Sequence, residues 1–325
     1  MPIHHSRDSR TPAFFTPVLC ALVLLMLQPV PLAGGQAQSQ PGPAPGPVVL
    51  ALSASTRALA LGGAFWTAGD GGHAIFHHPA LISGAGFSAS RQRFGGATNI
   101  AVSGSGGWMG GTAAAGVSFL EYGTSVDSPL DLPREAAALI GGGDLAAAEY
   151  AATAGFAAGL LGGEVGAAVK LIGQRLGGLR GSTFAVDLGV GREIGPVSAA
   201  LTLQNLGPGL TVGRHEVPLA RRMIAGFGTR RAPVGPLDIG GAFQVVREGN
   251  GDVVPGGGVE IAWWPVQRRV FIVRIGAVRV VEGESSPLSF GAGFEGDRIR
   301  IDFGYRDFQH TDLRVGSHRI GIAIR

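Results

Sequence analysis

The sequence of 325 residues predicts an all-β fold, a closed antiparallel transmembrane barrel of about 14 strands. Three observations lead to this prediction. Apolar and polar side chains alternate with a period of two along most of the chain, charged residues make up only 15% of it, and no stretch beyond the N-terminus offers the roughly 18 consecutive apolar residues of a spanning helix. A barrel reconciles these observations, because it spreads its lipid-facing residues over alternate strand positions.

The first 37 residues have the layout of a secretory signal peptide, which we assign to 1–37. Arg7 and Arg10 precede an apolar run over 13–27, and small residues follow it, as in other export signals. Cys20, the single cysteine, lies in that run, so we expect no disulfide and no catalytic thiol in the exported chain. Residues 38–47 are rich in proline and are expected to form a spacer.

Residues 48–84 lack the alternation of the rest of the chain. They contain an arginine, a Gly-Gly-Ala turn, an acidic residue and a Pro-Ala-Leu end: Arg57, Gly62, Gly63, Ala64, Asp70, Ala74, Pro79, Ala80 and Leu81. This signature, with short motifs in matching order downstream, resembles the PorV/PorQ branch of the FadL-type outer-membrane proteins. The resemblance implies a barrel of about 14 strands over 85–325, with 48–84 folded inside it as a plug, or hatch.

The alternating segments number about fourteen, and single-chain bacterial barrels have an even number of strands. Most of them reach the length of about 9–11 residues that a tilted strand needs to cross a bilayer. They fall at about 86–94, 97–105, 111–121, 148–160, 163–175, 181–193, 196–205, 219–230, 235–247, 253–264, 268–281, 287–295, 298–307 and 313–325. The longer interruptions at 122–147 and 206–218 are expected to be outer loops.

The alternation also assigns the two faces of the barrel wall. A charged side chain that faces lipid at the midplane costs about 2–4 kcal/mol for Arg, so the charged residues on the polar faces are predicted to point into the lumen. They are Lys170, Asp187, Arg298, Arg300 and Asp302. The other lumen positions are mostly Gly, Ala, Ser and Thr. Such small residues suit a wall against which the plug segment packs closely.

The candidate site residues of the plug segment are Arg57, Gly62, Gly63, Phe65, Trp66, Asp70, His73, Ile75, Phe76, His77, His78 and Pro79. Its apolar members would lie beside an apolar ligand. His73 and His77 are four residues apart, and a helix would place them on one face as a candidate metal pair. A structural role is favoured for them, because only Asp70 adds a carboxylate at ligand spacing. No metal and no cofactor is therefore predicted.

The sequence does not indicate an enzyme, because no Gly-x-Ser-x-Gly elbow and no Ser-His-Asp or carboxylate constellation stands out. It also lacks a concentrated basic patch with interleaved aromatic residues, so nucleic acid is not an expected partner. The expected partner is the lipid bilayer of the bacterial outer membrane. Small hydrophobic ligands and exported proteins are the two expected kinds of cargo.

Two functions follow from these observations. A FadL/PorV-type barrel would either transport hydrophobic compounds across the outer membrane, with the plug holding the ligand, or hand over exported proteins that dock on the loops at 122–147 and 206–218. The alternative from another class is an exported soluble β-rich protein of a structural or adhesin-like kind. A soluble sandwich, however, would carry more surface charge than this chain has.

Overall fold

The structure is a computed structural model that describes residues 46–65, 71–122, 147–280, 286–310 and 313–324. The segments with alternating apolar and polar residues form strands, and these strands make up the wall of a barrel. Fourteen antiparallel strands form a closed barrel, as the sequence predicts. The sheet closes because β1 pairs with β17 at one seam while β10 pairs with both β7 and β12 at the other. No sheet edge is therefore left unpaired in the wall, which is the condition for a sheet to cross a bilayer.

The strands of the wall are β1 (Gly86–Phe94), β2 (Ala97–Trp108), β3 (Gly111–Tyr122), β4 (Ala147–Leu160), β5 (Gly163–Leu176), β6 (Leu179–Ile194), β7 (Val197–Leu206), β10 (Arg222–Thr229), β12 (Leu237–Glu248), β13 (Val253–Val266), β14 (Arg269–Val278), β15 (Leu288–Glu295), β16 (Ile299–His310) and β17 (Leu313–Ile324). Every predicted strand is present, with ends that differ by up to three residues. The predicted strand at 219–230 begins later, at Arg222, after Pro218, which has no backbone N–H to donate.

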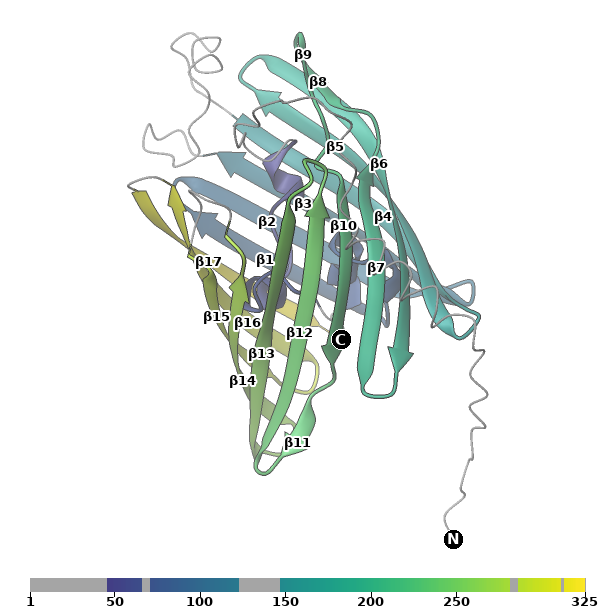
Figure 1. Ribbon diagram of the computed structural model, residues 1–325, viewed down its shortest axis with the longest axis vertical. Helices are drawn as coiled ribbons and strands as arrows, with labels where there is room; N and C mark the ends of the chain where they lie inside the picture. The colour runs from purple at the N-terminus through teal and green to yellow at the C-terminus, as the bar shows by residue number, and fades with distance from the viewer. Residues whose placement is uncertain (1–45, 66–70, 123–146, 281–285, 311–312, 325) are drawn as a thin grey trace. The chain divides into compact units, whose positions relative to one another are not determined.

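Three short strands lie outside the main wall. β8 (Leu210–Val212) and β9 (His215–Val217) form a hairpin within the connection from β7 to β10, and β11 (Ala232–Val234) pairs with the start of β12. Figure 1 shows the β8–β9 hairpin and β11 at opposite ends of the barrel.

The outer face of the wall is apolar and the inner face is polar. Val169 on β5 and Phe184 on β6 point outward and are 56% and 59% exposed. Lys170 and Asp187 occupy the alternate positions of the same two strands and are buried. Exposed apolar side chains on a closed barrel would be unfavourable in water but suit contact with lipid chains. The fold therefore places the chain in the outer membrane and does not fit the alternative of a soluble β-rich protein.

The two ends of the barrel differ in their connections. Tight turns at 109–110, 161–162, 195–196 and 267–268 lie at the end where β1 begins and β17 stops, which we call the turn end. The strand ends joined by the longest connections lie at the opposite end, which we call the loop end; these are the ends of β3 and β4, of β7 and β10, and of β14 and β15. In barrels of this kind the short turns are periplasmic and the longer loops external.

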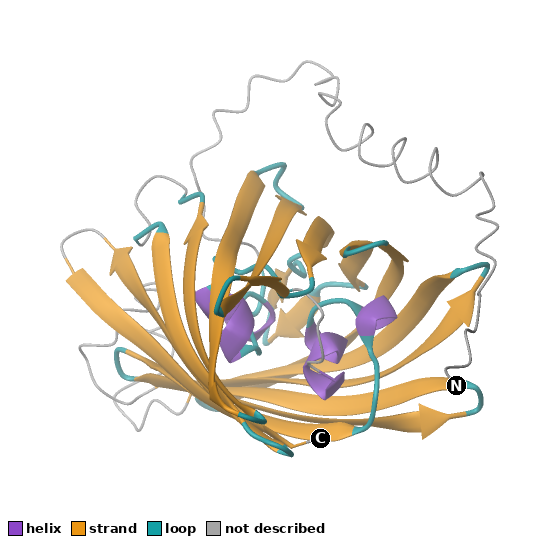
Figure 2. Ribbon diagram, turned by 90° about the horizontal axis from the view of Figure 1, so that it is seen from below, coloured by secondary structure: helices purple, strands orange, loops and turns teal. Residues whose placement is uncertain are grey.

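The described residues before β1, which we call the inner segment (46–65 and 71–84), contact the interior face of the wall. They form one short α-helix and three 3-10 helices: η1 (Val48–Leu50), α2 (Thr56–Ala60), η2 (Gly71–Phe76) and η3 (Pro79–Leu81). Figure 2 shows these helices on the concave side of the strands. None of the helices in the described ranges is long and apolar enough to cross a membrane.

Candidate functional site

Glycines of the wall let the backbone of the inner segment approach the strands closely. At Gly276 on β14 an added Cβ would lie only 2.2 Å from the backbone nitrogen of Gly62, just after α2. Gly258 on β13 faces the same stretch, with 2.9 Å between its ideal Cβ and the Cα of Leu61. Gly62 itself has a φ of 64°, a left-handed conformation that glycine adopts without strain. Only glycine fits at these contacts.

The same arrangement recurs where the other helices meet the wall. At Gly166 on β5 an added Cβ would lie 2.4 Å from the carbonyl carbon of Pro79, at the start of η3. At Gly116 on β3 it would lie 2.5 Å from the ring of Phe76, at the end of η2. Glycines on several strands thus form a seat for the inner segment.

A cluster of buried charges joins α2 to the wall. Arg57 places its Nη2 2.7 Å from Oε1 of Glu260 on β13. Arg274 on β14 lies 3.2 Å from Glu260 and 2.7 Å from Asp302, and Arg300 lies 2.7 Å from the other oxygen of Asp302. Buried charges of this kind are stable only when they are paired and hydrogen-bonded. Removing Arg57 from the wall would therefore disturb the whole cluster.

A fully buried arginine of β17 supports the chain just before α2. Arg319 donates 2.6 Å to the carbonyl oxygen of Ala54 and 2.7 Å to the hydroxyl of Ser90 on β1. It also donates to the side-chain oxygens of Gln92 and Asn99. The planar guanidinium group, with five donors in fixed directions, can satisfy all these acceptors at once.

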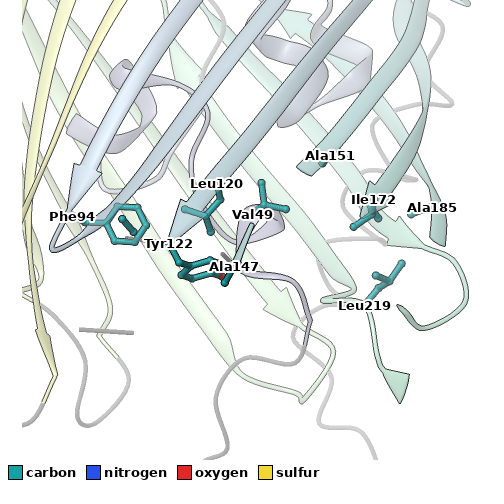
Figure 3. Packing of buried hydrophobic residues seen from close by; sticks show 10 residues of the cluster. Val49, Phe94, Leu120, Tyr122, Ala147, Ala151, Ile172, Ala185 and Leu219 are labelled. Carbon is teal, nitrogen blue, oxygen red and sulfur yellow. The ribbon is translucent and has the colours of Figure 1, made fainter. Parts of the chain in front are cut away.

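A third contact, at the loop end, holds η1. The backbone nitrogen of Val49 donates to Oε2 of Glu149 on β4 over 2.8 Å, and the hydroxyl of Tyr122 donates to the other oxygen over 2.8 Å. Val49 also packs in an apolar cluster with Phe94, Leu120, Ile172 and Leu219 among others (Figure 3). Glu149 is absent from the residues that the sequence predicts for the site, because a single acidic residue on an Ala-rich strand gives no local signal of its partner.

The pair Lys170 and Asp187 lies on the inner face, with 2.7 Å between Nζ and Oδ2. Lys170 also donates to the side chain of Asn205, whose backbone nitrogen donates to Asp187. Asn205 has a φ of 59°, a left-handed conformation, at the point where β7 gives way to the connection with the β8–β9 hairpin. The pair therefore holds the end of β7 where its register with β6 shifts, between Val186 and Leu188, and this geometry gives it a structural part to play.

His78 is buried between the inner segment and β7. Its Nδ1 is hydrogen-bonded to the hydroxyl of Thr202, and the neighbouring Gln204 donates 2.7 Å to the carbonyl oxygen of His77. His78 lies outside the spanning strands. Burial lowers the pKa of its imidazole from 6.5 to about 4, because the charged form loses its hydration. His78 is therefore neutral at pH 7.

The two histidines considered as a metal pair occupy different surroundings. The helix at Gly71–Phe76 is a 3-10 helix with about three residues per turn, so residues four apart do not share a face as they do in an α-helix. His77 lies after its end and stacks on Phe65, with ring centroids 4.4 Å apart. Among the residues that the structure describes, no group of three or more His, Cys, Asp or Glu side chains could hold a metal.

The remaining predicted site residues are distributed as follows. Phe65 and Ile75 are buried, Phe76 is half-buried, and Gly63 has a φ of 85°. Trp66 and Asp70 lie outside the described residues, as do the predicted signal peptide and most of the proline-rich spacer. Arg298 differs from the expectation: it is exposed in the turn before β16, whereas Arg300 and Asp302 are buried. The reason is that β16 starts one residue later than expected, at Ile299, so Arg298 lies before the strand.

Comparison with known proteins adds to this geometry. No protein-family model matches the chain, and no curated protein matches it. Among solved structures, the toluene transporter TodX of P. putida is 11% identical, with 82% of this chain and 96% of that chain covered and a TM-score of 0.55. The monoaromatic hydrocarbon channel CymD is 10% identical, with 83% and 96% covered and a TM-score of 0.56.

The fold is that of an outer-membrane β-barrel. At these identities the likeness shows the fold alone. TodX and CymD share this barrel fold, and the FadL-type resemblance drawn from the sequence stays a prediction. The narrower resemblance to the PorV/PorQ branch stays a prediction.

Proposed function

We propose that this barrel transports small apolar compounds across the outer membrane, and that the inner segment is the plug that controls their passage. The observation that carries the proposal is a series of apolar clusters along the inner segment, within a lumen whose wall is otherwise polar. They begin with the cluster around Val49 at the loop end. They continue with a cluster of Phe65, Ile75 and Ile82, and with a third around Leu61.

These clusters give an apolar solute a surface to follow. Phe65 and Ile75 pack against small wall residues such as Ala114, Ala157 and Ala168. A displacement of the inner segment would uncover this alanine-lined wall and leave room for a small apolar molecule, because alanine fills little volume. The likeness to a toluene transporter and a monoaromatic hydrocarbon channel supports a small aromatic hydrocarbon as the cargo.

A second candidate function is the hand-over of exported proteins, with the lumen permanently shut. Two observations favour it. The inner segment is tightly seated on the wall, with contacts that leave no room for a side chain at Gly276 or Gly166. The strand ends that carry the two longest connections of the sequence, between β3 and β4 and between β7 and β10, also lie at the loop end, where an exported protein would dock.

One experiment separates the two functions. Cells that produce the wild-type chain, a variant without 123–146, or no chain would be tested for uptake of labelled toluene and for release of surface proteins. Transport predicts faster uptake with the wild type and with the loop variant than without the chain. Uptake that is equal in all three, together with protein release lost both in the loop variant and in cells without the chain, would contradict transport and support docking.

A further inference from the structure

Two arginines stand on the lipid-facing side of β1, near the loop end. Arg91 and Arg93 alternate with the buried residues Ser90 and Gln92, so their side chains point outward, and both are exposed. The same outward face of β1 begins with Phe87, which is also exposed, at the turn end. The outer face of this strand thus changes from apolar to basic over its short length.

The strand register shows how far the arginines lie along the wall. Arg91 is directly opposite Ile100 on β2 and Ile320 on β17, which are 42% and 57% exposed. Arg93, one outward position further toward the loop end, is opposite Thr98 and His318. Arg91 therefore lies in the last apolar row of the wall, and Arg93 lies in the first polar row beyond it. This is the depth at which lipid chains give way to headgroups.

No residue that the structure describes compensates the charge of this pair. Among the described residues, neither arginine has a hydrogen-bond or ion-pair partner. The outward carboxylate of Glu121 is opposite Thr98 on the far side of β2, two strand spacings from Arg93, or about 10 Å. Asp307 on β16 accepts a hydrogen bond from Tyr305. Both guanidinium groups are therefore open to a partner from outside the chain.

The rim of the barrel is low at this point. β1 ends at Phe94 and turns at once through Gly95 and Gly96, whereas β17 continues past Ser317, the partner of Phe94, to Leu313. The arginines thus lie beneath a short hairpin beside a taller one, where no described loop covers them. A lipid headgroup can approach the wall here.

We propose that Arg91 and Arg93, with His318 beside them, bind a phosphate group of a phosphorylated glycolipid in the outer leaflet of the membrane. Guanidinium groups bind phosphate oxygens through paired hydrogen bonds, and basic residues at the membrane surface select anionic lipids. The long aliphatic part of Arg91 lies along the apolar row while its charged end extends to the headgroup level. The site is at the loop end, and this end faces the external leaflet. The proposal depends on the barrel and its orientation and is independent of the transported cargo.

Native mass spectrometry of the purified chain in neutral detergent tests this site. Lipid A with both phosphates and lipid A without phosphates would be added to the wild type, to R91Q/R93Q and to R91K/R93K. A matched control is R269Q/R298Q, which removes two exposed arginines at the turn end and changes the net charge equally. Heat-dependent gel migration would show that each variant retains its folded barrel.

We expect the wild type and the control to bind phosphorylated lipid A equally, and R91Q/R93Q to bind at least fivefold less. R91K/R93K, which keeps the charges but loses the planar donor pair, should fall between them. Dephosphorylated lipid A should bind weakly to all four proteins. Equal binding of phosphorylated lipid A by R91Q/R93Q and the wild type would overturn the proposal, as would an equal loss in the control variant.

Discussion

Replacing Gly276 by alanine tests whether the inner segment depends on its glycine seat. The new Cβ would lie 2.2 Å from the nitrogen of Gly62, and ordinary contact begins near 3.4 Å. The backbone after α2 must therefore retreat by about 1.2 Å, and overpacking of this kind costs about 1–3 kcal/mol. That cost raises the population of the displaced inner segment by about 5- to 150-fold.

Single-channel recording in planar bilayers measures this population as the fraction of time in a conducting state. We expect Gly276→Ala to conduct more often than the wild type, because a displaced inner segment leaves water-filled space along the polar wall. Gly107→Ala is the matched control, since an added Cβ there meets no atom within 4 Å. Equal conductance of Gly276→Ala, Gly107→Ala and the wild type would show that the inner segment does not depend on close contact at Gly276.

Three further changes test the charges, the pH dependence and the outer face. Glu260→Gln leaves Arg57 and Arg274 without their shared carboxylate, and we expect a loss of about 3–5 kcal/mol in the free energy of unfolding by urea. Burial lowers the pKa of His78 to about 4, so between pH 6.5 and 4 the displaced inner segment binds more protons than the segment packed on the wall. The free energy that favours the packed segment should therefore fall by about 3 kcal/mol as the pH falls through this window. Hydrogen exchange of residues 74–82 would detect the weakening, and His78→Gln should abolish the pH slope. Val169→Arg puts a charge on the lipid side of β5 and should lower the free energy of unfolding by about 2–4 kcal/mol, a loss that a solvent-facing position would not show.

The wall of the barrel could be predicted from the sequence because its signal is local. Each strand alternates apolar and polar residues, and the two sets separate at once onto lipid and lumen faces. The face of the strand on which Lys170, Asp187 and Asp302 lie follows from their immediate neighbours in the sequence alone. All three are buried in the structure. Register and closure then follow from tight turns and from the need to leave no edge unpaired.

The seating of the inner segment could not be predicted in the same way, because its contacts join residues far apart in the chain. Glu149 accepts from the backbone of Val49, a hundred residues earlier. Ile172 is an apolar residue on the otherwise polar inner face of β5. Its place there is explained by another distant contact, because it packs in the cluster that surrounds Val49. The sequence shows small residues on the wall, but it does not say which of them will face a helix.

A disulfide between the inner segment and the wall tests whether the inner segment must move for transport. Thr56 in α2 and Gly321 on β17 suit T56C/G321C, because the Cβ of Thr56 lies 3.4 Å from the ideal Cβ position of Gly321, close to the spacing of about 3.5–4.5 Å in disulfides. We expect this disulfide to form on oxidation and to stop toluene uptake, and we expect a reductant to restore uptake. Failure of the two cysteines to join in a folded barrel, or uptake that is unchanged once they have joined, would contradict this expectation.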